Sequence, residues 1–197
     1  MKEANPARVY TRTAIILHWL VALGVLTQFC LGWWMRTLPD KTGVQAYWFN
    51  LHKSIGLTVF MLVLLLLLWR LLNPPPPLPQ TMPWWQRWAA KACHRGLLLC
   101  VMVMPIAGYM GSSFTRFPIK YWGMSLPNFW GWASPELKAL CSLIHFYTVI
   151  VFMTLVAIHI AAALLHLVVN RDQLFRRMWT WRRVAAAAPE QAPVRSA

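Results

Sequence analysis

The chain of 197 residues is long enough for one domain, and 58% of its residues are apolar while only 12% are charged. A soluble domain has about one quarter charged residues, so this composition excludes an ordinary soluble protein and indicates a membrane protein. The net charge of +14 does not indicate a nucleic-acid partner, because the basic residues lie between long apolar runs and at the two ends of the chain. We therefore expect membrane lipid as a partner, and no nucleic acid.

Four segments have the roughly 20 mostly apolar residues that a transmembrane helix requires. They lie near residues 14–34, 51–72, 92–111 and 140–169. The first follows a basic N-terminus, as in a signal peptide, but no small-residue cleavage site follows it, so we expect a retained helix. Pro105 should kink the third segment. The predicted fold class is all-α, an integral membrane four-helix bundle.

The connections between these spans differ sharply in composition. Four consecutive prolines at 74–77 predict a stiff connector, and the tryptophan-rich segment 82–91 predicts an interfacial segment before the third span. The loop at 112–135 is rich in Gly, Pro and aromatic residues and should lie on the membrane surface. We predict one four-helix transmembrane domain over residues 1–183 and a disordered, alanine-rich tail over 184–197.

The basic residues also predict the orientation of the chain. With four spans, the N-terminal segment, the second connection and the C-terminal segment share one side of the membrane. Thirteen of the nineteen Lys and Arg residues fall in these three segments. Basic residues gather on the cytoplasmic side, so both termini should be cytoplasmic.

All six histidines lie in or at the edge of a predicted span. Ionisable groups inside a membrane are costly, so each one is a candidate functional residue. A single histidine is explained equally well by a hydrogen bond between helices, but six together are not. They are His18, His52, His94, His145, His159 and His166.

Spacing and depth arrange four of these histidines in two pairs. His145 and His159 are 14 residues apart, about 40° short of four full helical turns, so they share one helix face about 21 Å apart along the axis. By depth in the membrane, His18 pairs with His159 near the cytoplasmic side, and His52 pairs with His145 near the opposite side. A histidine from each of two helices can hold an iron porphyrin between them.

Other uses of intramembrane histidines fit less well. A structural zinc ion requires four ligands at one point, whereas these histidines lie at two depths with no accompanying carboxylate or cysteine cluster. The acidic residues all lie outside the spans, which argues against a proton pump or an ion transporter. Glycines such as Gly24, Gly32 and Gly56 fit either a flat macrocycle against the backbone or close helix contacts.

Three further residues have an open assignment. His94 begins the third span, and His166 follows His159 by two helical turns, about 10 Å away. Either could replace a proposed ligand, contact a quinone or a haem propionate, or lie at the interface. Lys53, next to His52, belongs with Arg116 and Lys120 to a group of basic residues on the periplasmic side, which would attract an anion or contact a propionate, or would simply face lipid headgroups.

Five sequence segments together carry a resemblance to a known family. They are ILHW at 16–19, LHKSIG at 51–56, WRLLNPPPPLP at 69–79, HRGLLLCVMVMPIAGYM at 94–110, and IHF with AIHIAAALLH between 144 and 166. This combination resembles the prokaryotic cytochrome b561 family, which includes a bacterial superoxide oxidase, over nearly the whole chain.

The resemblance implies a multi-pass protein of the bacterial inner membrane that binds two haems b per chain. The family's axial ligands match His18, His52, His145 and His159, and a quinone is thought to approach near His166. The implied function is electron transfer across the membrane between a periplasmic partner and the quinone pool. In the superoxide oxidase, superoxide is the donor and ubiquinone the acceptor.

Two function classes lead from the sequence, and a non-haem transporter or structural membrane protein, which would purify as a colourless protein, is a third. The first is a self-contained electron-transfer cytochrome, with superoxide:ubiquinone oxidoreductase as its enzymatic form. The second is a cytochrome b anchor subunit for a periplasmic dehydrogenase of the hydrogenase or formate dehydrogenase type. Co-purification with a dehydrogenase would distinguish them.

Overall fold

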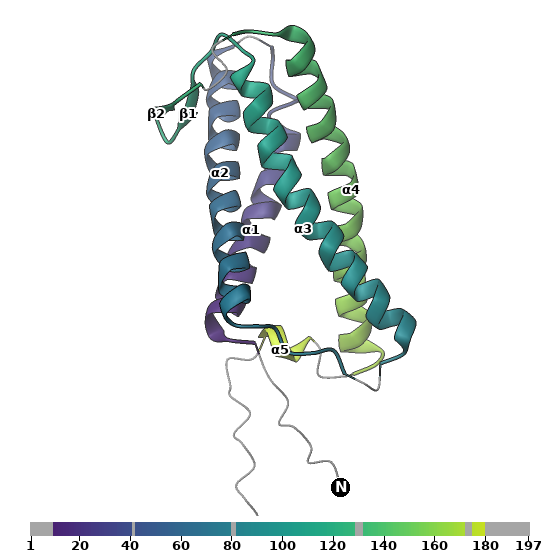
Figure 1. The fold of residues 1–197 in the computed structure, drawn as a ribbon. Helices are drawn as coiled ribbons and strands as arrows, with labels where there is room; N and C mark the ends of the chain where they lie inside the picture. Colours follow the sequence, from purple (N-terminus) through teal and green to yellow (C-terminus); the bar gives the residue numbers. More distant parts are fainter. Residues whose placement is uncertain (1–9, 41, 80–81, 129–131, 172–174, 180–197) are drawn as a thin grey trace, which may run out of the picture.

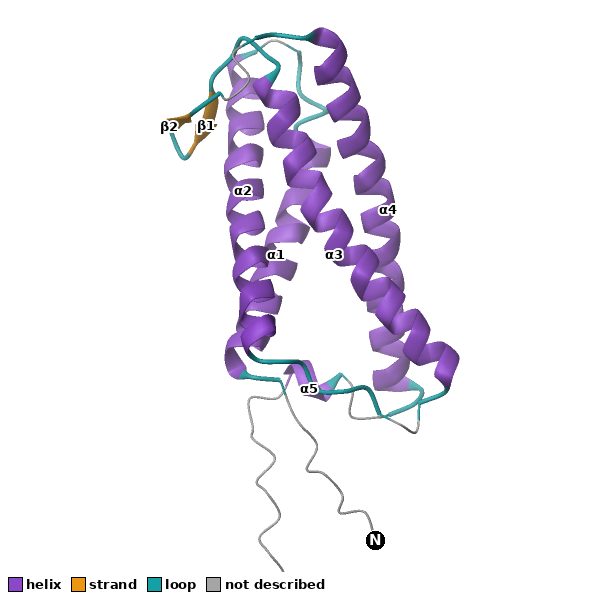
Figure 2. Ribbon diagram, in the orientation of Figure 1, coloured by secondary structure: helices purple, strands orange, loops and turns teal. Residues whose placement is uncertain are grey.

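The computed structural model describes residues 10–40, 42–79, 82–128, 132–171 and 175–179. Within these ranges, four long helices run side by side, and a small β-hairpin and a short fifth helix lie at opposite ends (Figures 1 and 2). The elements are α1 (Arg12–Trp34), α2 (Gly43–Leu72), α3 (Trp84–Ser113), β1 (Ile119–Tyr121), β2 (Met124–Leu126), α4 (Pro135–Val168) and α5 (Arg176–Trp179).

The four predicted spans are confirmed, since each long helix has the length and apolar composition to cross a membrane. Three of them begin earlier than hydropathy indicates. α2 starts at Gly43 because the Thr42 side chain accepts a hydrogen bond from the backbone N–H of Gln45, and Ser134 caps α4 in the same way. The predicted interfacial segment before the third span is the first part of α3.

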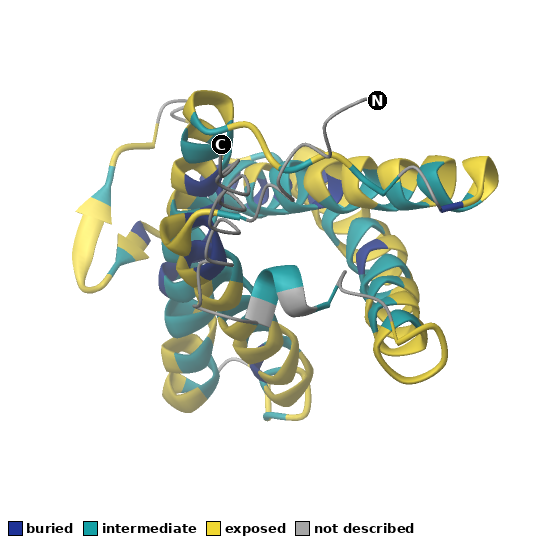
Figure 3. Cartoon of the chain, turned by 90° about the horizontal axis from the view of Figure 1, so that it is seen from below, coloured by how far each residue is buried: buried dark blue, intermediate teal, exposed yellow. Residues whose placement is uncertain are grey.

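The helices form two antiparallel pairs, α1 with α2 and α3 with α4, and the pairs diverge toward one end (Figure 1). We call this the terminal end, since α1 begins and α4 finishes there, and we call the other the hairpin end. Seen from below, α5 lies between the pairs at the terminal end (Figure 3). The Trp19 indole donates to the backbone oxygen of Met178 at 2.9 Å, and Arg177 donates to that of Pro77 at 3.0 Å. These bonds hold α5 against α1 and the proline connector.

Little of the apolar surface is buried between the helices. α4 has 34 residues, of which only Cys141 and Phe152 are buried. Leu143, Ile150 and Leu164 are about half exposed, as are many other apolar side chains. A soluble protein would not expose so continuous an apolar surface, so these faces suit contact with lipid.

The β-hairpin was not predicted and lies in the segment expected to be a surface loop. β1 and β2 are antiparallel and are joined at Trp122 and Gly123, which both have positive φ, 47° and 91°. The hairpin is fixed to α2, because the Trp122 backbone N–H donates to Ser54 at 3.0 Å and its indole donates to Thr58 at 3.2 Å. Residues 184–197, predicted to be disordered, lie outside the described ranges.

Candidate functional site: two pairs of histidines

Three histidines meet near the terminal end of the bundle. The ring of His18 on α1 lies across from that of His159 on α4, with 6.4 Å between their centroids. The ring of His94 on α3 is closer still to His159, at 5.2 Å. Depth in the membrane predicts that His18 pairs with His159, and the structure brings both rings together with His94 beside them.

A second pair lies toward the hairpin end. The ring of His52 on α2 is 6.3 Å from that of His145 on α4, measured between centroids. The first and second halves of the chain thus contribute one histidine each to both pairs. The four residues occupy the predicted arrangement, and their role as haem ligands stays a prediction.

The two ring separations match the distance that a single bridging metal ion requires. A metal–imidazole bond is about 2 Å long and a ring nitrogen lies about 1.1 Å from the ring centroid, so two rings on opposite sides of one ion have centroids about 6 Å apart. The measured 6.4 and 6.3 Å agree with this geometry. An imidazole on each face of an iron porphyrin therefore fits both pairs.

His145 is held in an orientation that suits a metal ligand. Its Nδ1 lies 2.8 Å from the backbone oxygen of Met104, and a carbonyl can only accept, so Nδ1 carries the proton and donates it. This leaves Nε2 unprotonated and available for a metal ion. Gly108 makes the contact sterically feasible, because a Cβ there would lie only 3.3 Å from Nδ1.

His52 is positioned by α1. The Gln28 amide donates to the His52 backbone oxygen at 2.9 Å, and Gly32 lies beside the ring, where an added Cβ would be 3.5 Å from Cε1. Gly24 and Gly56 instead serve close contact between α1 and α2, since a Cβ on either would lie 2.5 Å from a side-chain atom of the other helix. The glycines left open in the sequence therefore divide between a site contact and helix packing.

Buried polar atoms without partners occur at both histidine levels. Within the described ranges, Nδ1 of His52 and Nε of Arg70 are buried with no hydrogen-bond partner. The positive charge of Arg70 acts on His18 and His94, which places it near the terminal-end pair. Buried polar groups normally have partners, so these atoms fit a site that takes a polar ligand such as haem, with its two carboxylates.

The remaining candidate residues lie close to the two pairs. Lys53 follows His52 in the chain, and the positive charge of Lys138 acts on it. Basic residues therefore gather at the hairpin end. His166, in the last turn of α4, has its Nδ1 3.2 Å from the Asn170 side-chain nitrogen. It therefore lies beyond His159 toward the terminal end of α4, as predicted from its spacing.

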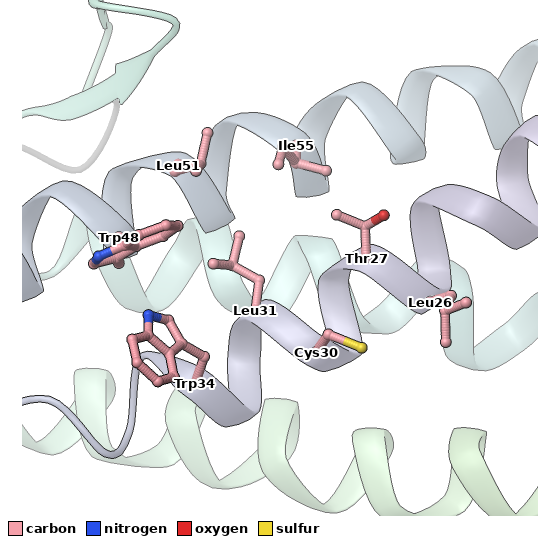
Figure 4. A pocket seen from close by; sticks show the side chains of 8 residues that line it. All are labelled: Leu26, Thr27, Cys30, Leu31, Trp34, Trp48, Leu51 and Ile55. Carbon is pink, nitrogen blue, oxygen red and sulfur yellow. The ribbon is translucent and has the colours of Figure 1, made fainter.

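The structure also has an apolar groove of about 490 Å³ between α1 and α2 (Figure 4). Trp34 and Trp48 lie at one end of it and Leu26 at the other. None of the candidate histidines lines this groove. Its apolar walls suit lipid chains.

Paired histidines that face one another across the two halves of a four-helix membrane protein are the arrangement that a membrane cytochrome uses to hold haem. The family model for prokaryotic cytochrome b561 matches residues 9–181. Two proteins of Escherichia coli (strain K12) are similar over nearly their whole length. Cytochrome b561 homolog 2 is 33% identical over 180 residues, covering 90% of this chain and 95% of the homolog, and cytochrome b561 homolog 1 is 27% identical over 183 residues, covering 86% and 96%.

The chain belongs to the prokaryotic cytochrome b561 family. It is a multi-pass protein of the bacterial inner membrane, it binds haem b, and it functions in electron transfer.

Proposed function

We propose that this chain holds two haems b and passes electrons through them across the inner membrane, between a periplasmic partner and the quinone pool. His18 and His159 would hold one haem, and His52 and His145 would hold the other. The observation that carries the proposal is the ring separation, 6.4 and 6.3 Å, which repeats at two levels of one helix. Bound haem supplies one-electron chemistry, and the chain supplies its ligands and their spacing.

The orientation follows from the basic residues. The terminal end of the bundle has the larger share of Lys and Arg, so we place it in the cytoplasm and the hairpin end in the periplasm. The His52–His145 pair then lies near the periplasmic side. The His18–His159 pair lies near the cytoplasmic side, where His94 and His166 stand next to a proposed quinone site.

The charges at the hairpin end favour a small anionic electron donor. Lys53 and Lys138 lie near each other, Arg116 precedes β1, and Lys120 lies within β1. Such a group attracts anions, so we propose superoxide as the donor and ubiquinone as the acceptor. Each superoxide gives up one electron and becomes oxygen, so two are needed to convert one ubiquinone, with two protons, to ubiquinol.

The test is a reduced-minus-oxidised spectrum of the purified protein, with haem quantified against protein. We expect two haems b per chain, reduction by superoxide, and ubiquinol formation when ubiquinone is present. A ratio near one in a fully loaded preparation would contradict the di-haem proposal. Two haems with no reduction by superoxide, together with co-purification of a dehydrogenase, would support the anchor-subunit function instead.

A further inference from the structure

Arg70 is a half-buried cation with no anion beside it among the residues that the structure describes. It lies in the last turn of α2, and its Nε is buried with no hydrogen-bond partner in the described part of the chain. Of the five acidic residues, the structure describes Asp40 and Glu136, and both lie at the hairpin end, far along the bundle from Arg70.

The histidines near Arg70 give it no counter-charge. Its charge acts on both His18 and His94, neither of which can compensate a guanidinium. A buried charge is costly unless it is paired and hydrogen-bonded, and a guanidinium forms its strongest pairs with carboxylate or phosphate. The position therefore calls for an anion beside the His18–His159 pair.

We propose that Arg70 binds a carboxylate of the group held between His18 and His159, namely a haem b propionate. This inference rests on the proposed function, because it assigns a partner to one of the two proposed haems. The end of α2 is fixed for this role, since the neighbouring Trp69 indole donates to the Thr11 side chain at 2.7 Å and so ties α2 to the start of α1.

A haem propionate fits better than a lipid phosphate. Lipid phosphates lie in the headgroup layer. The Nε atom of the Arg70 guanidinium is instead buried within the bundle. A cation beside a haem also favours the reduced form, which carries one positive charge fewer. Arg70 should therefore raise the midpoint potential of this haem relative to the same haem beside a neutral side chain.

The experiment compares Arg70→Gln and Arg70→Lys in the full-length protein by potentiometric titration and haem quantification. Arg177→Gln is the matched control, because Arg177 is a cation at the same end that donates to the Pro77 backbone oxygen. For Arg70→Gln we expect a lower midpoint potential for one haem alone. We also expect about tenfold weaker retention of that haem, because a charged hydrogen bond is lost. Arg70→Lys should keep most of the potential, and Arg177→Gln should change neither quantity.

A second measurement identifies the anion. Apo-protein is loaded with haem b or with its dimethyl ester, which lacks both carboxylates. The ester should abolish the difference in haem retention between wild type and Arg70→Gln. If the difference persists with the ester, or if Asp172→Asn reproduces the effect of Arg70→Gln, the partner is a lipid phosphate or a protein carboxylate and the inference is wrong.

Failure of this inference differs from failure of the proposed function. Wild-type protein with two haems, combined with an Arg70→Gln variant of unchanged potentials and retention, overturns the Arg70 assignment alone. Wild-type protein without haem at the His18–His159 pair overturns both. If Arg70→Gln does not fold, wild-type protein loaded with the dimethyl ester must still show weaker retention at this pair, and equal retention contradicts the assignment.

Discussion

Gly108→Val should weaken haem binding at the His52–His145 pair and leave the other pair unaffected. A Cβ at position 108 would lie 3.3 Å from Nδ1 and 3.4 Å from Cε1 of His145, and valine adds two methyl groups about 1.5 Å further out. The ring cannot retreat without lengthening the 2.8 Å bond from Nδ1 to the Met104 oxygen. Overpacking and loss of this bond cost about 2–4 kcal/mol together, or about 30- to 1000-fold in haem affinity.

The assay is haem content and affinity, measured by titrating haem into apo-protein in detergent and recording the reduced spectrum. Gly43→Val is the matched control, because a Cβ at Gly43 meets nothing within 4 Å. Gly108→Ala should be much milder, since the ring has to yield by only a few tenths of an ångström. If Gly108→Val retains both haems at wild-type affinity, or loses the haem of the His18–His159 pair, our account of how α3 positions His145 is refuted.

Three other predictions address the pairing, the topology and the electron donor. His18→Ala and His159→Ala should remove the same haem, and His145→Ala should remove the other. Haem content and difference spectra measure this. Loss of a haem in His94→Ala but not in His18→Ala would show that His94 is the ligand. A reporter fused to the C-terminus should be active in the cytoplasm, because basic residues cluster on that side, and activity only in the periplasm would reverse the proposed orientation. Reduction by superoxide should slow as salt rises, because exposed charges are screened over about 10 Å at 0.1 M. Lys53→Gln should also slow this reduction while both haems stay in place. A reduction rate that neither change alters would contradict superoxide as the donor.

The sequence was most informative where a physical constraint acts on it directly. Spans must be apolar over a fixed length, so all four helices could be predicted. The pairing of His145 with His52 and of His159 with His18 followed from helical rise along α4 and from the depth of His18 and His52 in their own spans. Helix ends were less predictable, since hydropathy reports the hydrocarbon layer and not the caps provided by residues such as Thr42.

Features that depend on contacts between distant segments could not be predicted. The hairpin depends on the docking of Trp122 onto Ser54, 68 residues earlier in the chain. Gly108 and Met104 matter because they face His145 on another helix, which no local pattern reveals. Arg70 belongs to the basic residues that predict the topology, but its place at the end of an apolar run also indicated a position partly within the bundle.

The division of both histidine pairs between the two halves of the chain has a consequence for biosynthesis. The α1–α2 half is made first and contains one histidine of each pair, whereas His145 and His159 both lie on α4, the last long helix to leave the ribosome. A chain interrupted before residue 135 therefore has neither pair complete. If the four histidines are the ligands, haem insertion must follow synthesis of α4, and a truncated product cannot hold a redox-active iron by two axial histidines.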